Sequence, residues 1–238
     1  MITVCKALKD ALLDLDVDGE KIEVLRNGVD LELFSPVGRA SARQTLGLES
    51  TAKIMLSVGY LIDRKGHDIA IRALRELDDV ILLIAGDGER RQFLERVAVE
   101  AGVADRVTFL GSMPHERLRF YFSAADALVL ASSREGWANV LLEAMACGCF
   151  PVAGNIESIR EWLVDGENSL LVDPGDPDAL AAAILHAIEQ TAFRQQRPQV
   201  VVLQNMKVFP ANREESGIEI KILAGQPEHK YANDEHFK

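Results

Sequence analysis

The sequence predicts an α/β protein built on a doubly wound parallel sheet. Short apolar segments alternate with amphipathic helical segments from residue 53 to residue 188, and residues 80–85 are continuously apolar, as in a strand covered on both faces. The connections are short, which favours right-handed crossovers between parallel strands. Because ligands of such sheets bind beyond the carboxyl ends of the strands, we expect the functional site at that edge.

The composition is that of a globular protein with an acidic balance. The chain has 238 residues, of which 48% are hydrophobic and 26% charged, and its formal net charge is −11. This length fits one domain, or one domain with an appendage. The negative charge argues against binding nucleic acid or an anionic membrane through bulk electrostatics. No apolar run is long enough for a transmembrane segment and the start lacks a signal pattern, so we expect a cytoplasmic protein.

The cysteines give no sign of a disulfide framework or a metal site. There are three, Cys5, Cys147 and Cys149, an odd number that fits a reducing compartment. The Cys147-Gly148-Cys149 segment has no neighbouring Cys/His pair to complete a tetrahedral site. Two small buried residues at a helix end are the favoured interpretation. The scattered histidines, including His67 and His115, are expected at the surface or at helix caps.

The elements follow from apolar periodicity and turn residues. Before residue 53 we predict a helix over 5–16, a strand over 22–26 and a helix over 40–46. The predicted strands are 53–58, 80–85, 107–110, 128–131, 150–153 and 169–172. Helical stripes fall at 70–77, 94–101, 118–125, 140–145 and 181–188. The tail, residues 193–238, departs from the pattern with two strand-like segments, 199–203 and 217–223, which leaves open a hairpin, a cover for apolar surface or partial disorder.

Four sharp loops are expected to meet at the carboxyl edge of the sheet: 59–66, 86–88, 111–113 and the loop containing Glu135. Arg64 and Lys65 precede a helix and suit a diphosphate, although solvated surface charges are an equally good interpretation. The Gly86-Asp87-Gly88 turn lacks the third glycine of a dinucleotide-binding fingerprint, which favours a tight strand-to-helix turn.

The stretch 133–148 has the character of a ligand site. A helix is expected to begin near Asn139, with Glu135 in the loop before it and Glu143 inside it. A helix N-terminus favours an anion, whereas carboxylates favour neutral donors such as sugar hydroxyls. This combination predicts a ligand that carries both phosphate and hydroxyl groups. Trp137 is expected to pack or to act through its backbone.

Residues 135–148, Glu-Gly-Trp-Ala-Asn-Val-Leu-Leu-Glu-Ala-Met-Ala-Cys-Gly, resemble the two-glutamate signature of the retaining family 4 glycosyltransferases, with seven residues between the acids. Segments 24–30, 58–67, 84–88, 109–111 and 166–172 also resemble that family, in order, so that the resemblance covers about residues 1–190. It implies the GT-B architecture, two Rossmann-like domains facing a cleft, of which this chain is similar to the C-terminal, donor-binding one. By this resemblance residues 1–20 are a remnant that links a missing N-terminal domain, and 21–192 form the donor domain.

The resemblance also implies roles for individual residues. Glu143 would hold the ribose hydroxyls, Glu135 a hydroxyl of the transferred sugar, and Arg64 and Lys65 the diphosphate leaving group. The catalytic residues implied are Arg64, Lys65 and Glu135, and the substrate-binding residues are Gly59, Gly111, Met113, Gly136, Trp137, Ala138, Asn139, Val140 and Glu143. The partner implied is a nucleotide-diphosphate sugar, with no metal ion or other cofactor, because the two cations and the helix N-terminus take the role of a divalent ion. The sequence does not identify the acceptor substrate. A second chain or the missing domain would complete the cleft.

Two segments depart from the family pattern. Tyr60 stands where many relatives carry an arginine, which leaves the phosphate charge to Arg64 and Lys65. Residues 155–161 replace a common Gly-Gly-x-Pro-Glu segment and leave the sugar specificity open.

Two alternatives to a donor-binding half of a glycosyltransferase remain at this point. One is a non-catalytic module that binds a nucleotide sugar or pairs with another chain, which the oligomeric state and a donor-hydrolysis assay would distinguish. The other is a nucleotide-sugar epimerase, which needs an acid and base set that this sequence does not show.

Overall fold

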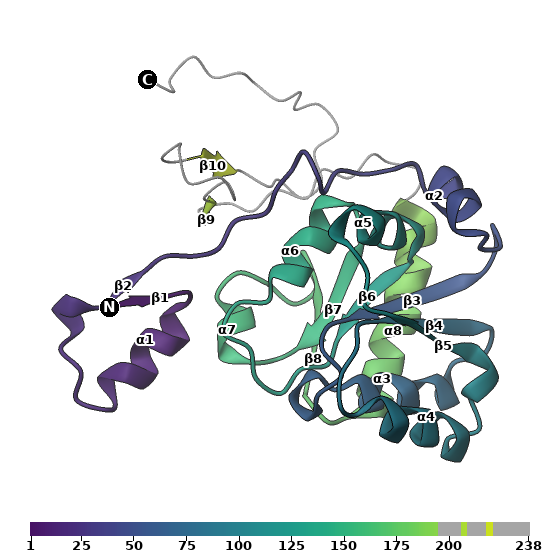
Figure 1. The fold of residues 1–238 in the computed structure, drawn as a ribbon, viewed down its shortest axis with the longest axis horizontal. Coiled ribbons are helices and arrows are strands. Elements are labelled where there is room, and N and C mark those ends of the chain that lie inside the picture. Colours follow the sequence, from purple (N-terminus) through teal and green to yellow (C-terminus); the bar gives the residue numbers. More distant parts are fainter. Residues whose placement is uncertain (195–205, 209–217, 221–238) are drawn as a thin grey trace.

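A parallel sheet of six strands forms the centre of the molecule (Figure 1). The computed structural model describes residues 1–194, 206–208 and 218–220. The strands are β3 (Lys53–Val58), β4 (Val80–Ala85), β5 (Val107–Gly111), β6 (Ala127–Leu130), β7 (Phe150–Gly154) and β8 (Leu170–Val172). Their spatial order is β5-β4-β3-β6-β7-β8, and all neighbours are parallel. The predicted doubly wound, Rossmann-like sheet is therefore confirmed, and the winding reverses between β3 and β6.

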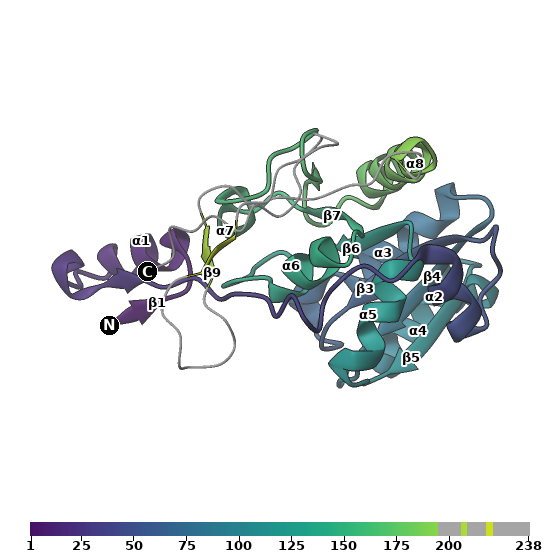
Figure 2. The same cartoon turned by 90° about the horizontal axis from the view of Figure 1, so that it is seen from above.

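Helices cover both faces of this sheet, as the two perpendicular views show (Figures 1 and 2). One apolar core holds residues of α3 (His67–Ala73), α4 (Arg91–Glu100) and α8 (Pro177–Arg194) against one face. The other core holds residues of α5 (His115–Ala124), α6 (Asn139–Ala146) and α7 (Glu157–Arg160). The central strands are buried on both sides, which explains their continuous apolar sequences.

The face of the sheet that α5, α6 and α7 cover also carries α2 (Arg39–Leu46). A buried ion-pair network attaches α2 to the sheet. The Arg43 guanidinium is 2% exposed and donates to Asp126 Oδ2 at 3.1 Å and to the Ala124 carbonyl at 3.0 Å. Asp126, the residue before β6, also accepts from Arg39 and from the backbone N–H of Ile54. Two guanidinium groups therefore share one buried carboxylate at the amino end of the sheet.

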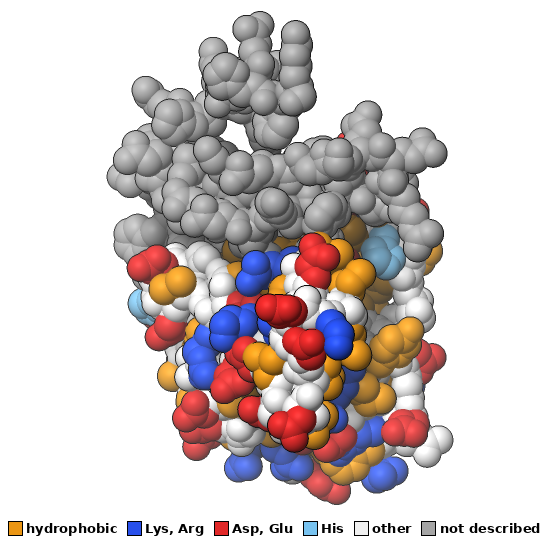
Figure 3. Space-filling model, turned by 90° about the vertical axis from the view of Figure 1, so that its left-hand side faces the viewer, with side chains coloured by type: hydrophobic (Ala, Val, Ile, Leu, Met, Phe, Trp, Pro, Cys, Tyr) orange, Lys and Arg blue, Asp and Glu red, His pale blue; other side chains and the backbone are white. Residues whose placement is uncertain are grey.

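The N-terminal segment forms a small unit beside the sheet (Figure 1). It consists of β1 (Ile2–Thr3), α1 (Lys6–Leu13) and β2 (Glu23–Val24), and β1 pairs with β2 in parallel. Thus β2 does not join the central sheet, although it falls inside the range predicted for the donor domain. Short 3-10 helices occur at Gly19–Lys21, Asp63–Lys65, Leu74–Glu76 and Ala104–Arg106. Over the side of the molecule shown in Figure 3, acidic, basic and apolar side chains are interspersed rather than grouped by charge.

The tail contributes one further pair of strands to the described structure. β9 (Met206–Val208) and β10 (Ile218–Ile220) pair antiparallel. β10 falls within the predicted strand 217–223, whereas the predicted strand 199–203 lies outside the described residues. Of the helices in the described part of the chain, none combines the length and apolarity that crossing a bilayer requires.

Candidate functional site

Three glycine turns form one continuous rim at the carboxyl ends of β3, β4 and β5. The Gly59 N–H donates to the Ala85 carbonyl at 3.0 Å, and the Gly86 N–H donates to the Gly111 carbonyl at 2.8 Å. A Cβ at Gly86 would lie 1.9 Å from the Gly59 carbonyl oxygen, so this close approach requires glycine. The Gly86-Asp87-Gly88 segment is thus a tight structural turn, as favoured from the sequence.

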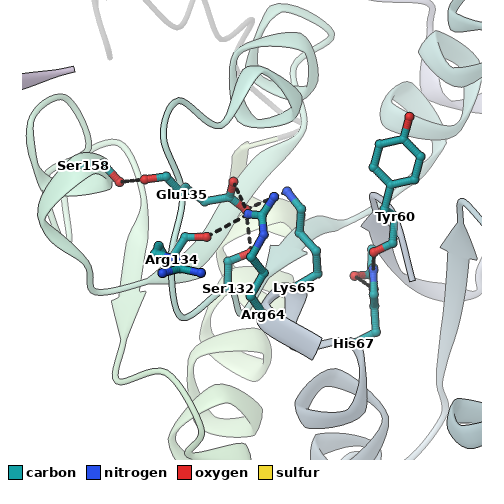
Figure 4. Close-up of polar contacts among 9 residues, drawn as sticks. Tyr60, Arg64, Lys65, His67, Ser132, Arg134, Glu135 and Ser158 are labelled. Carbon is teal, nitrogen blue, oxygen red and sulfur yellow. Dashed lines mark hydrogen bonds and ion pairs between the residues drawn. The ribbon is translucent and has the colours of Figure 1, made fainter. Parts of the chain in front are cut away.

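At the reversal of the winding, the loop after β3 meets the loop after β6. Figure 4 shows the side chains of Arg64 and Lys65 converging on Glu135. The Lys65 ammonium donates to Glu135 Oε1 at 2.7 Å, while an Arg64 Nη1 lies 3.4 Å from Oε2 and 3.0 Å from the Arg134 carbonyl. The three residues implied as catalytic are therefore brought together, and Lys65 and Arg64 are paired rather than freely solvated.

Two buried serines fix the Glu135 loop. Ser132 Oγ donates to Glu135 Oε1 at 2.7 Å, and Ser158 Oγ donates to the Glu135 carbonyl at 2.8 Å (Figure 4). The side chain of Glu135 is only 6% exposed, so its charge depends on these donors and on Lys65. Neither serine was identified from the sequence. The contact of Ser158 with Glu135 joins residues 23 positions apart, so it has no local signal.

A pocket of about 380 Å³ opens beside this cluster, between the glycine rim and α6. It is lined by Gly59, Lys65, Met113, Trp137, Ala138, Asn139, Val140 and Glu143 among the implied residues, and further by Val58, Tyr60, Ala85, Gly86, Asp87, Ser112, His115 and Leu118. Arg64, Gly111, Glu135 and Gly136 adjoin these residues but are not among the described residues that line the pocket. Lys65 thus connects the pocket to the Glu135 carboxylate.

The N-terminus of α6 faces this pocket without a side-chain cap. Its N-cap residue is Ala138, which makes no side-chain hydrogen bond, and the first turn carries no acidic residue. The backbone N–H groups at such a helix end attract anions through hydrogen bonding and the helix dipole. Because Ala138, Asn139 and Val140 line the pocket, the positive end of α6 is directed at the same space as Lys65.

Glu143 lies one turn further along α6, on the pocket wall. Its side chain is 14% exposed, and Oε1 lies 3.9 Å from Nδ1 of His115, whose side chain is 62% exposed. Burial raises the pKa of the Glu143 carboxyl, and the nearby His115 partly opposes this rise. The two glutamates therefore have different surroundings: Glu135 is held by cations, whereas Glu143 faces the pocket with few charged neighbours.

His67 is buried behind the rim, so the expectation of a surface or cap role is wrong for this residue. Its ring is 1% exposed and lies between Ser57 Oγ, 2.9 Å from Nδ1, and the Tyr60 carbonyl, 3.2 Å from Nε2. Burial lowers the pKa of His67 to about 4. The neutral ring donates from Nε2 to the carbonyl and accepts at Nδ1 from the hydroxyl, which supports the turn that leads to Lys65.

Trp137 packs as expected, and it connects the pocket wall to the N-terminal segment. It is 8% exposed, its ring centroid lies 5.6 Å from that of Trp162, and the Arg26 guanidinium lies 5.7 Å from its ring. Glu161 accepts from Arg26 at 3.1 Å and from the Ala7 N–H, near the start of α1, at 2.7 Å. One carboxylate, at the end of α7, therefore ties α1 to Arg26, which lies against Trp137 of the pocket wall.

The cysteines are buried and free, as expected from their spacing. Cys147 and Cys149 are 3% and 2% exposed, and burial raises the pKa of both thiols, that of Cys147 to about 12. Across the part of the chain that is described, the acidic, cysteine and histidine side chains form no group suited to a metal ion.

Comparison with known proteins identifies the family of this domain. The family model of glycosyl transferases group 1 matches residues 38–199. A D-inositol 3-phosphate glycosyltransferase of Mycolicibacterium gilvum is 36% identical over 172 residues, which cover 70% of this chain and 39% of the relative. The lipopolysaccharide core biosynthesis glycosyltransferase LpsE of Rhizobium meliloti is 36% identical over 163 residues, 68% of this chain and 47% of the relative.

Solved structures of glycosyltransferases have the same fold. Sucrose-phosphate synthase from Thermosynechococcus elongatus superposes with a TM-score of 0.75 at 31% identity, over 81% of this chain and 49% of that one. Anabaena HepE in complex with UDP-glucose superposes with a TM-score of 0.74 at 28% identity, over 80% and 54%. This chain spans about half the length, or less, of the relatives it matches. The chain belongs to the glycosyl transferases group 1 family and forms a GT-B glycosyltransferase domain.

Proposed function

We propose that this chain is the donor-binding part of a retaining glycosyltransferase and that its pocket holds a nucleotide-diphosphate sugar. The observation that carries the proposal is that Lys65, the uncapped N-terminus of α6 and Glu143 line one pocket, with Glu135 bonded directly to Lys65. Positive groups for a diphosphate and carboxylates for hydroxyls thus occur together, as a nucleotide sugar requires.

The diphosphate is assigned to the part of the pocket between Lys65 and α6. There the ammonium of Lys65 and the backbone N–H groups of Ala138 and Val140 are donors for phosphate oxygens, whereas the Asn139 N–H donates to the Trp137 carbonyl. Negative charge grows on this diphosphate as the bond to the sugar breaks, and fixed donors in a partly buried site stabilise that charge. Arg64 adds a second cation through its contact with Glu135, and in this proposal protein groups supply the positive charge without a metal ion.

The nucleoside is assigned to the other end of the pocket. Glu143 accepts hydrogen bonds from the ribose hydroxyls, and its raised pKa reflects a poorly solvated position in which such donors are favourable. Gly111 ends β5, and Ser112 and Met113, in the loop that follows it, line the pocket. By the family resemblance, we assign the base to this loop.

The transferred sugar lies next to Glu135, which accepts one of its hydroxyls. Retention of configuration is proposed because the spacing of Glu135 and Glu143 is similar to that of the retaining family 4 enzymes. Since this chain matches only about half or less of these relatives' length, we assign acceptor binding to a further domain or a second chain that faces the pocket.

The test is a calorimetric titration of UDP-glucose, the ligand in the HepE complex, with GDP-glucose and ADP-glucose as comparisons. Removal of a charged hydrogen bond costs about 1–3 kcal/mol, so Lys65→Ala should weaken binding by roughly 5- to 150-fold. Lys53→Ala removes an exposed lysine at the opposite end of β3 and should leave the affinity unchanged. Binding of equal strength by Lys65→Ala and the wild type would remove the phosphate assignment.

A further inference from the structure

The Glu135 carboxylate accepts a hydrogen bond from Lys65, the same lysine that the proposed diphosphate needs. We propose that Glu135 makes the pocket discriminate: it competes with phosphate for Lys65, so that a nucleotide-diphosphate sugar binds in preference to the nucleotide diphosphate alone. This inference rests on the proposed function and adds to it a basis for selecting the sugar-bearing ligand.

The geometry places the carboxylate and the incoming phosphate on the same ammonium group. Lys65 lines the pocket, is 13% exposed in its side chain, and donates to Glu135 Oε1 at 2.7 Å. Its methylene groups lie beside Gly59, on the rim of the pocket. Any phosphate bound to Lys65 from the pocket therefore has a carboxylate one hydrogen bond beyond it.

The charges make this arrangement unfavourable for a bare diphosphate. Arg64, Lys65 and Glu135 together carry a net charge of only about +1, because the carboxylate offsets one of the two cations. Glu135 is 6% exposed, so little water screens its repulsion of a phosphate. The carboxylate cannot turn away freely, because Ser132 holds Oε1 at 2.7 Å and Ser158 holds the Glu135 carbonyl.

A sugar offsets this repulsion by donating a hydroxyl to the same carboxylate. Oε1 of Glu135 already accepts from both Lys65 and Ser132, whereas Oε2 makes a long contact of 3.4 Å with Arg64. A carboxylate oxygen accepts about two hydrogen bonds, so Oε2 has capacity for a hydroxyl. A hydrogen bond between a neutral hydroxyl and an ionised acceptor is a strong one. Glu135 thus penalises the diphosphate and favours the sugar.

The test compares UDP, UDP-glucose and inorganic diphosphate on the full 238-residue chain by calorimetry at constant salt. Glu135→Gln keeps the size of the side chain and an oxygen for Ser132 but removes the charge. We expect UDP and inorganic diphosphate to bind at least fivefold more tightly to this variant. The ratio of UDP-glucose affinity to UDP affinity should fall at least tenfold. Glu100→Gln removes an exposed acidic charge on α4, away from the pocket, and should change neither quantity.

An unchanged ratio, or weaker UDP binding, in folded Glu135→Gln would overturn the inference. If Glu135→Gln fails to fold by circular dichroism, Glu135→Asp replaces it: the carboxylate is drawn back from Lys65 by one methylene, and UDP affinity should still rise. A wild-type chain that binds neither UDP nor UDP-glucose refutes the proposed function instead. The competition of Glu135 with phosphate for Lys65 is then decided by inorganic diphosphate, which must bind more tightly to the Glu135 variant than to the wild type.

Discussion

Gly66, the residue between Lys65 and α3, is expected to tolerate no side chain. It adopts a left-handed conformation with φ of +65°, and a Cβ there would lie 2.2 Å from the carbonyl oxygen of Ala131 and 2.8 Å from its carbon. Both atoms are backbone at the end of β6, so neither can rotate away. This contact joins the two loops that carry Lys65 and Glu135.

The magnitude follows from two separable contributions. A non-glycine residue in the left-handed region costs about 1–2 kcal/mol. Relieving an overlap of this size requires a backbone shift of roughly 1 Å, comparable to overpacking a core, which costs about 1–3 kcal/mol. Gly66→Ala should therefore destabilise the domain by about 2–5 kcal/mol. Gly102→Ala is the matched control, because Gly102 has φ of +72° but no heavy atom within 4 Å of a Cβ, so it incurs only the first contribution.

Urea denaturation followed by circular dichroism measures both variants against the wild type. Gly66→Ala should lose about 1–3 kcal/mol more than Gly102→Ala, and it should also weaken UDP-glucose binding because Lys65 is displaced from Glu135. Equal destabilisation by the two substitutions would refute the close packing of the β3 and β6 loops.

Three further predictions concern buried charge. Burial lowers the pKa of His67 to about 4, so between pH 4 and pH 6.5 the folded state binds fewer protons than the unfolded state. The contribution of the neutral ring to the free energy of unfolding is complete above pH 6.5 and is lost as the pH falls toward 4, a loss of about 3 kcal/mol. Urea denaturation of His67→Gln should lack this part of the decline, and a pH profile identical to that of the wild type would contradict the assignment. Burial raises the pKa of the Glu143 carboxyl above its ordinary value of 4.5. The folded state therefore holds that proton more tightly, and stability falls as the pH rises above 4.5. Glu143→Gln should gain stability relative to the wild type as the pH rises above 4.5, and it should lose affinity for UDP but not for inorganic diphosphate. A parallel pH profile with unchanged UDP affinity would count against the place of Glu143 on the pocket wall. Asp126→Asn leaves the buried Arg43 without its carboxylate, which should cost about 3–5 kcal/mol in urea denaturation, and a cost below about 1 kcal/mol would show that the network contributes little.

The central fold was predictable because its signals are local. Each strand from β3 to β8 is a short apolar run between turn residues, and each crossover helix carries a stripe that faces the sheet. The short connections then determine the parallel pairing. By contrast, the pairing of β1 with β2 joins segments of two residues each, too short for a recognisable period.

The site was predictable to the level of the loops but not of the contacts. The two-glutamate spacing and the position of Lys65 before a helix indicated which residues would meet. The burial of His67 could not be read from its sequence neighbours, because its partners, Ser57 and the Tyr60 carbonyl, lie on the preceding strand and turn. The pairing of Glu135 with Lys65, residues 70 positions apart, depends on the reversal of winding between β3 and β6.

The most direct test of the account is a crystal structure of this chain with UDP-glucose bound. The account predicts diphosphate oxygens within hydrogen-bonding distance of Lys65 Nζ and of the first backbone N–H groups of α6, with the ribose hydroxyls on Glu143. A nucleotide bound outside this pocket, or bound in reverse with its ribose at Lys65, would contradict it.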